Sequence, residues 1–125
     1  MKNRFHTLRH IAVGTLICTT LAAAATIVSE FHVRTIESNL RRLEWKTLQE
    51  SNLREFRIQR STNQHDWSPI GTVPAAQDGQ TSHSYSFDDN RIFKSETATL
   101  YYKLVLVDLQ GNTTDHHAIA STAGV

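Results

Sequence analysis

The sequence predicts an all-β sandwich of about seven short strands, preceded by a single N-terminal transmembrane α-helix. Three observations support this prediction. An uncharged run from Ile11 to Ser29 follows a basic start. From Glu30 onward, apolar and polar residues alternate within short segments, which is the period of a half-buried strand. Polar turn segments separate these stretches at near-regular spacing, as in two-sheet all-β domains.

The composition fits one globular domain and excludes several other classes. The 125 residues are 39% hydrophobic and 20% charged, which is typical of a folded domain and not of a disordered chain. The single cysteine excludes an internal disulfide framework and a zinc site built on cysteine pairs. The formal net charge is +1, so the net charge does not point to a nucleic-acid partner.

Residues 1–10 are interpreted as a basic cytoplasmic tail and residues 11–29 as a transmembrane helix. Three basic residues and no acid precede the uncharged run, whereas all twelve acidic residues follow it. Basic flanks stay in the cytoplasm, so residues 30–125 are expected in the periplasm or outside the cell. Nineteen helical residues span roughly 28 Å, close to the ~30 Å hydrocarbon core. We therefore expect a single-pass protein retained in a bacterial inner membrane, with the lipid bilayer as one of its partners.

A cleaved signal peptide is the alternative interpretation of the same segment. The basic start is followed by an apolar run over residues 11–21 and by small residues at 22–25. Cleavage after Ala24 or Ala25 is compatible with this pattern. A lipoprotein signal is excluded because Cys18 lies in the middle of the run and no small residue directly precedes it.

Small residues recur along the apolar run and predict a helix-packing surface. Gly14, Cys18 and Ala22 are spaced four residues apart, so on a helix they form one narrow stripe. Small side chains let a second membrane helix approach closely. The sequence therefore predicts that the helix packs against other membrane-protein subunits through these three residues.

After residue 30, seven segments carry the strand pattern: 31–35, 42–47, 55–59, 67–73, 83–87, 99–107 and 117–120. Pro69 and Gly71 indicate that 67–73 is an edge strand. Leucines within residues 34–51 are also compatible with a helix, but strict alternation around Trp45 favours a strand. Short strands with turns at this spacing are typical of an immunoglobulin-like sandwich.

The blocks LEWKTLQESN, FRIQRSTNQHDWSPIGTV, YSFDD and YYKLVLVDLQGN occur in this order. Together they resemble the fibronectin type III-like modules of exported bacterial proteins, over nearly all of residues 31–120. The resemblance implies a sandwich core filled by Trp45 and by the aromatic residues at 56, 85, 87 and 102. It also implies that the hydroxyl of Tyr102, or alternatively that of Tyr101, bonds back to the chain as a corner.

The exterior domain is expected to be non-catalytic and to hold no cofactor or metal ion. The seven histidines lack metal-ligand spacing, and the adjacent His116 and His117 point to opposite faces of a strand. Asp78 and the turn at residues 88–90 offer oxygen ligands for calcium but lack the spacing of a calcium-binding loop. There is no nucleophile motif and no phosphate-binding loop, so we predict no small-molecule substrate.

A row of apolar residues on the strand at 99–107 predicts a contact with a partner. If Tyr102 and its alternate neighbours face the core, then Tyr101, Val105 and Val107 face outward beside Lys103. An exposed apolar row of this kind often marks an interaction site. The alternatives are a bulge that turns Val107 inward or a loop that covers the row.

We therefore expect an accessory or stabilising subunit of a larger bacterial membrane complex, of the respiratory, photosynthetic or envelope type. It would dock through its helix and through its exterior sandwich. The alternative function is a secreted adhesion module, or one that binds carbohydrate or protein.

Overall fold

The computed structural model describes residues 25–93 and 99–121, and the regular structure within these ranges is all β. The strands are β1 (Ile27–Glu37), β2 (Leu40–Gln49), β3 (Leu53–Ser61), β4 (Ser68–Pro74), β5 (His83–Asp89), β6 (Leu100–Asp108), β7 (Thr113–Asp115) and β8 (Ile119–Ser121). Within these ranges, no helix has the length and hydropathy that a membrane crossing requires. The predicted packing residues Gly14, Cys18 and Ala22 lie outside the described residues.

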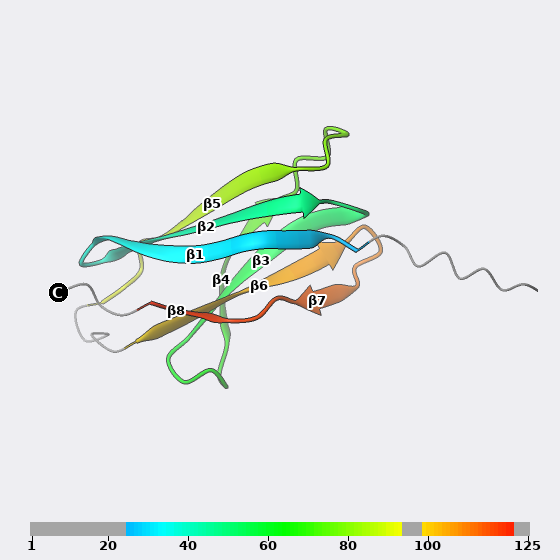
Figure 1. Ribbon diagram of the computed structural model, residues 1–125. Helices are drawn as coiled ribbons and strands as arrows, with labels where there is room; N and C mark the ends of the chain where they lie inside the picture. The colour runs from blue at the N-terminus through cyan, green and yellow to red at the C-terminus, as the bar shows by residue number, and fades with distance from the viewer. Residues whose placement is uncertain (1–24, 94–98, 122–125) are drawn as a thin grey trace, which may run out of the picture.

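The strands form two antiparallel sheets that face each other (Figure 1). One sheet has three strands in the order β1-β2-β5. The other has the order β4-β3-β6-β7, and β8 pairs with the same strand, β6, near its beginning. The all-β sandwich predicted from the alternation is confirmed at this level. The short β7 was missed because three exposed residues show no alternation of apolar and polar side chains.

The first strand begins earlier than the sequence analysis predicted. Residues 27–29, assigned there to a transmembrane helix, belong to β1, and Ile27 pairs with Gln49 of β2. Thr26 is also tied to the sandwich, because its hydroxyl accepts the Ser51 N–H at 3.1 Å. The predicted boundary at residue 30 is therefore wrong. The end of a membrane segment and the start of a strand can both be apolar, so the sequence does not show where β1 begins.

The predicted strand around Trp45 is confirmed, and the helical alternative is not. Trp45 is 1% exposed and lies on β2 between Phe31 of β1 and Tyr85 of β5. Its ring stacks on Tyr85 with centroids 5.7 Å apart and meets Phe56 of β3 edge-on at 5.3 Å. Phe56 and Tyr102 are fully buried, whereas Tyr85 and Phe87 are partly buried and pack against the same core. The aromatic core therefore joins the two sheets.

β4 lies at an edge, as Pro69 and Gly71 predicted. Gly71 is required for a different reason, which is close packing between the sheets. A Cβ at this position would overlap the ring of Phe87 on β5, with 2.5 Å to ring atom Cζ. The absent side chain lets β4 and β5 approach where the two sheets meet.

Candidate functional site

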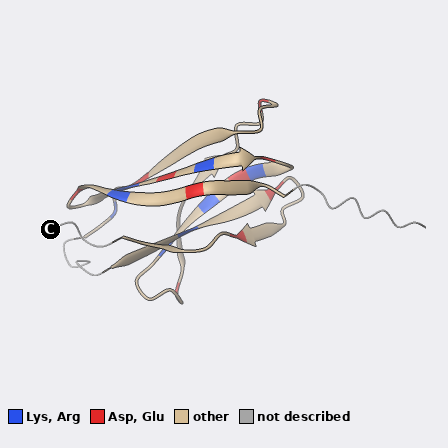
Figure 2. Ribbon diagram, viewed as in Figure 1, with Lys and Arg blue, Asp and Glu red and all other residues tan. Residues whose placement is uncertain are grey.

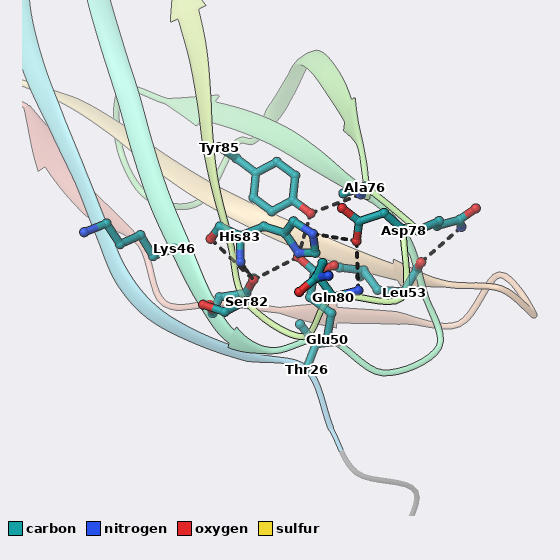
Figure 3. A network of polar contacts seen from close by, with 12 residues as sticks. Thr26, Lys46, Glu50, Leu53, Ala76, Asp78, Gln80, Ser82, His83 and Tyr85 are labelled. Atoms are coloured by element: carbon teal, nitrogen blue, oxygen red, sulfur yellow. Dashed lines mark hydrogen bonds and ion pairs between the residues drawn. The ribbon is translucent and has the colours of Figure 1, made fainter.

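Four polar side chains converge where β2 ends and β5 begins, and we call them the His83 cluster: Glu50, Asp78, His83 and Tyr85 (Figure 3). His83 Nε2 lies 2.8 Å from Asp78 Oδ1, and His83 Nδ1 lies 3.1 Å from Glu50 Oε1. Tyr85 donates its hydroxyl to the same Glu50 oxygen over 2.6 Å. The His83 side chain is 14% exposed. The imidazole is therefore held between two carboxylates at the edge of the core.

Strand pairing, rather than the loop alone, positions the cluster. Thr47 of β2 is opposite His83 of β5, and its fully buried hydroxyl accepts the His83 backbone N–H at 3.1 Å. The same hydroxyl donates to Glu50 Oε1 at 2.8 Å. Ser82 donates its hydroxyl to the Thr47 carbonyl oxygen, also at 2.8 Å. Because these groups lie on or next to paired strands, the side chains are held in place before any ligand arrives.

Burial and hydrogen bonding together set the charges in the cluster. Burial lowers the pKa of His83, but the hydrogen bond to Asp78 and the nearby charges of Glu50 and Asp78 outweigh it, so the pKa is raised. The pKa of Asp78 is lowered, first by the Gln80 backbone N–H that donates to it at 2.9 Å. Burial, with the hydrogen bond to Glu50, raises the pKa of Tyr85 to about 12. The cluster thus favours an imidazolium beside a neutral tyrosine.

A hollow of about 380 Å³ adjoins the cluster at this end of the sandwich. Three loops contribute to its lining, which consists of Glu50, Asn52, Leu53, Gln77, Gly79, Gln80, Thr81 and Leu109. Gln77 has a left-handed backbone with φ of 49°, and its amide group donates to the Leu53 carbonyl oxygen at 3.2 Å. A non-glycine residue held in such a region costs about 1–3 kcal/mol, and such residues gather at ligand-binding sites.

The carboxylates next to His83 determine the chemistry available in the cluster. His83 Nε2 is hydrogen-bonded to Asp78 Oδ1, whereas His83 Nδ1 lies 3.1 Å from Glu50 Oε1 without a hydrogen bond of good geometry. Within the part of the chain that the structure describes, no group of three His, Cys, Asp or Glu side chains is placed to hold a metal ion. The oxygen ligands considered for calcium are far apart, because Asp78 lies near the start of β5 and Asp88 near its end. Asp88 instead forms a 2.7 Å ion pair with Arg42.

The sequence analysis did not identify the His83 cluster. It named Glu50 and Tyr85 only within the blocks that resemble fibronectin type III-like modules, and His83 only as the first residue of a strand. The available signal was weak: His83 and Tyr85 are two apart and share one face of a strand. Their carboxylate partners come from two other segments, and only the pairing of β2 with β5 reveals which ones.

A second polar network lies at the other end of β5 and stabilises the fold. Tyr102 donates its hydroxyl to Asp89 Oδ2 at 2.7 Å, and Arg60 donates to both oxygens of that carboxylate at 3.1 and 2.8 Å. Asp89 is 2% exposed, and a buried charge requires such pairing. Tyr102 therefore does not form the backbone-bonded corner that the resemblance implied, because its hydroxyl bonds to the Asp89 side chain.

The apolar row predicted on β6 is not exposed at Val105 and Val107. Neither residue belongs to the main core cluster, yet they are only 6% and 0% exposed. β6 lies between β3 and β7, and the Arg57–Glu55 ion pair of 3.8 Å on β3 is directly beside these two positions. The expectation of an exposed contact is wrong for both valines, because they are flanked by Glu55 and Arg57 of β3 on one side and by residues of β7 on the other.

Tyr101 is partly exposed, and its role as a partner contact stays a prediction. Its neighbour on the same face, Lys103, is engaged within the chain. Lys103 Nζ lies 4.6 Å from the centre of the Trp67 ring and 3.0 Å from Asp115 Oδ2. The cation–π contact and the ion pair occupy this face of the sheet next to Tyr101.

No known protein family and no curated protein matches the sequence. Solved structures share the fold. Pectate lyase PelI from Erwinia chrysanthemi, in complex with tetragalacturonic acid, matches with a TM-score of 0.56 at 17% identity. That match covers 78% of this chain but only 28% of the lyase, so the chain spans little more than a quarter of that protein. A structure described as a myokine matches with a TM-score of 0.53 at 14% identity, over 82% of this chain and 98% of its own.

These likenesses show the fold alone. Together with the two antiparallel sheets and their shared aromatic core, they define the described part of the chain as an all-β sandwich domain.

Proposed function

We propose that the chain is an exported, non-catalytic binding module with a fibronectin type III-like sandwich, released by cleavage of its N-terminal segment. The observation that carries this proposal is the start of the fold. β1 begins at Ile27, and the hydroxyl of Thr26 exchanges hydrogen bonds with the backbone N–H and carbonyl of Ser51 at 3.1 and 3.3 Å. Residues from 26 onward are therefore committed to the sandwich.

With β1 starting at Ile27, the apolar segment before it is shorter than a membrane-spanning helix usually is. Residues 11–25 number fifteen and span about 22 Å as a helix, against a hydrocarbon core of about 30 Å. Fifteen residues are within the length of a signal-peptide apolar region. Cleavage after Ala24 or Ala25 would release the chain within two residues of the first strand, with no loss of strand pairing.

The competing function is the anchored accessory subunit predicted from the sequence. The small-residue row Gly14, Cys18 and Ala22 favours it, because such a row allows close packing in a membrane. The anchor would hold the sandwich against the lipid headgroups, since no linker residues separate the apolar run from β1. The two functions differ in whether residues 11–25 persist in the mature chain.

The experiment is an intact-mass measurement on the chain expressed with its own N-terminus in a bacterial host. We expect a soluble exported form whose measured mass is that of a chain starting at Ala25 or Thr26. Replacing residues 22–25 with leucine, which removes the small residues that cleavage needs, should leave the full-length chain in the membrane fraction. An uncleaved wild-type chain in the membrane fraction would overturn the proposal and support the anchored subunit.

We assign binding to the hollow beside the His83 cluster. Its lining mixes amide and hydroxyl groups, such as those of Gln80 and Thr81, with the apolar Leu53 and Leu109. Hydrogen-bonding groups next to apolar surface suit a carbohydrate, whose own surface is similarly mixed.

A panel of neutral and acidic oligosaccharides tests this assignment. We expect the exported chain to bind a subset, and Gln80→Ala to weaken that binding. Gln59→Ala, on the outer face of β3, is the matched control and should leave binding unchanged. Equal losses of oligosaccharide affinity in both variants, or no binding to any oligosaccharide, would refute the assignment of carbohydrate binding to this hollow.

A further inference from the structure

β1 presents an open edge at one side of the three-stranded sheet. Within the described ranges it pairs with β2 alone, and its eleven residues, without a proline, are about twice the usual strand length. The edges of the other sheet are blunted: β4 contains two prolines, and β7 and β8 have three residues each. β5 packs against β4, and β1 lies beside β8 with the centre of the Phe31 ring 5.8 Å from that of His116, but within the described ranges no backbone pairing joins β1 to β8. An open edge exposes backbone N–H and C=O groups that pair with another strand.

The sequence of β1 is complementary to itself. Pairing with β2 is regular from Glu30 to Thr35, between register shifts at both ends of the strand. If a second copy of β1 pairs antiparallel about His32, Glu30 lies opposite Arg34 of the second copy, and Phe31 lies opposite Val33 of the second copy. A two-fold axis repeats each of these pairs, so the edge matches its own surface.

Neighbouring registers lose this match. In a symmetric antiparallel pair, one residue lies on the two-fold axis opposite its own copy, and we call it the centre. Because opposite residues must share a face of the sheet, the neighbouring registers are those centred on the residues next to His32. A centre at Phe31 places Arg34 opposite Val28. A centre at Val33 places Glu30 opposite Ile36 and His32 opposite Arg34. In either case a charged side chain loses its counter-charge, and pairing about His32 is favoured.

The charges needed for this pairing are accessible. The Arg34 side chain is 54% exposed and that of Glu30 is 51% exposed, and Figure 2 shows an acidic and a basic segment along β1. Within one chain, Arg34 lies opposite Arg42 of β2, which is unfavourable for like charges. Arg34 donates two hydrogen bonds to Glu44, at 2.8 and 3.1 Å, and Glu30 lies 3.5 Å from Lys46 Nζ, so both charges are paired within the chain while their side chains stay exposed. Glu30 of a second copy would place a carboxylate on the open side.

The inner face of the strand adds apolar contact. Phe31 and Val33 are partly buried and pack against the core, and the Phe31 ring meets Trp45 edge-on at 6.4 Å. Facing each other across the two-fold axis, these side chains would extend the core from one sandwich into the next. Aromatic residues opposite β-branched ones are favourable cross-strand pairs.

We infer that the chain forms a symmetric dimer with a second copy of itself, through antiparallel pairing of the two β1 edges about His32. Two three-stranded sheets then become one sheet of six strands. Because an edge pairing buries less surface than most stable dimers, the dimer is expected to form reversibly with concentration.

Light-scattering mass measurement across a concentration series tests the inference on the exported chain as it is isolated. The wild-type chain should shift from monomer to dimer. Arg34→Glu and Glu30→Arg each place like charges opposite one another twice, and each should weaken the dimer about tenfold or more. Arg57→Glu, a matched charge reversal on the other sheet, should leave the dimer unchanged.

The double variant E30R/R34E makes the result decisive. It restores opposite charges between the two copies. Within each chain, however, it leaves a carboxylate at position 34 beside Glu44 and a guanidinium at position 30 beside Lys46. Self-pairing therefore predicts recovery of the dimer, whereas a purely internal role of these residues predicts a further loss. Weaker dimerisation of the double variant than of either single variant overturns the inference.

Cross-linking tests the register separately. Directly opposite residues in antiparallel strands have Cα atoms about 4.5–5.5 Å apart, which a disulfide spans. In a Cys18→Ser background, His32→Cys should form a covalent dimer on mild oxidation, and Arg57→Cys should not. A chain that stays monomeric at every concentration and is not cross-linked overturns the inference, whatever other protein binds β1.

Discussion

Replacing Gly71 with alanine tests the close approach of the two sheets at β4 and β5. Gly71 pairs with Ile58 of β3, and its missing side chain makes room for the ring of Phe87 on β5. A Cβ at position 71 would overlap ring atom Cε2 and lie 2.5 Å from Cζ. Carbon atoms favour separations of about 3.5–4.0 Å, so the ring must retreat by about 1 Å.

The expected cost follows from that displacement. Phe87 is packed against the core, so its ring cannot move without disturbing its neighbours. Overpacking of this kind costs about 1–3 kcal/mol, and the lower backbone entropy of unfolded alanine returns about 0.4–1 kcal/mol. We expect Gly71→Ala to lower the free energy of unfolding by about 1–2 kcal/mol. For a domain of this size the melting temperature should fall by about 4–16 °C.

A double-mutant cycle measured by urea unfolding identifies the cause. Phe87→Leu removes the two ring atoms that a Cβ at position 71 would meet. In that background Gly71→Ala should cost nothing or stabilise by up to about 1 kcal/mol. If its cost is the same in both backgrounds, within about 0.5 kcal/mol, the two residues are not coupled and the steric argument is refuted.

Three other substitutions, together with Tyr101→Phe as a control, probe the two polar networks and the buried valine Val107 by the same unfolding measurement. Tyr102→Phe leaves Asp89 without a hydroxyl donor and should cost about 1.5–3 kcal/mol, whereas Tyr101→Phe should stay within about 0.5 kcal/mol; similar costs would contradict the role of the Tyr102 hydroxyl. Because the pKa of His83 is raised by folding, its ionised form stabilises fully below about pH 6.5, and this contribution is lost as the pH rises through the higher folded value. Wild type should therefore lose more stability than His83→Gln between about pH 6 and pH 9, and parallel profiles would refute the imidazolium. Val107→Ala should cost about 1.5–3 kcal/mol because the side chain is fully buried, and an unchanged stability would mean that it faces solvent.

The alternation of side chains predicted most of the sandwich because each strand buries one face. Trp45 is the clearest case: polar residues on both sides of it indicated a strand, and it lies at the centre of the aromatic core. Pro69 and Gly71 likewise indicated an edge, since proline cannot donate to a ladder of hydrogen bonds. These features depend on local chemistry and on a period of two, which a linear sequence contains.

Long-range pairing determined the rest. Local hydropathy could not reveal that Ile27 pairs with Gln49, because a membrane segment and a buried strand use the same apolar residues. Alternation predicted an exposed Val107, but its burial depends on the side chains that β3 and β7 place beside it. The His83 cluster required the β2–β5 register, which brings Glu50 to His83 from a distant segment. In each case the deciding contact joins residues far apart in the chain, and its energy depends on a geometry that exists only in the folded state.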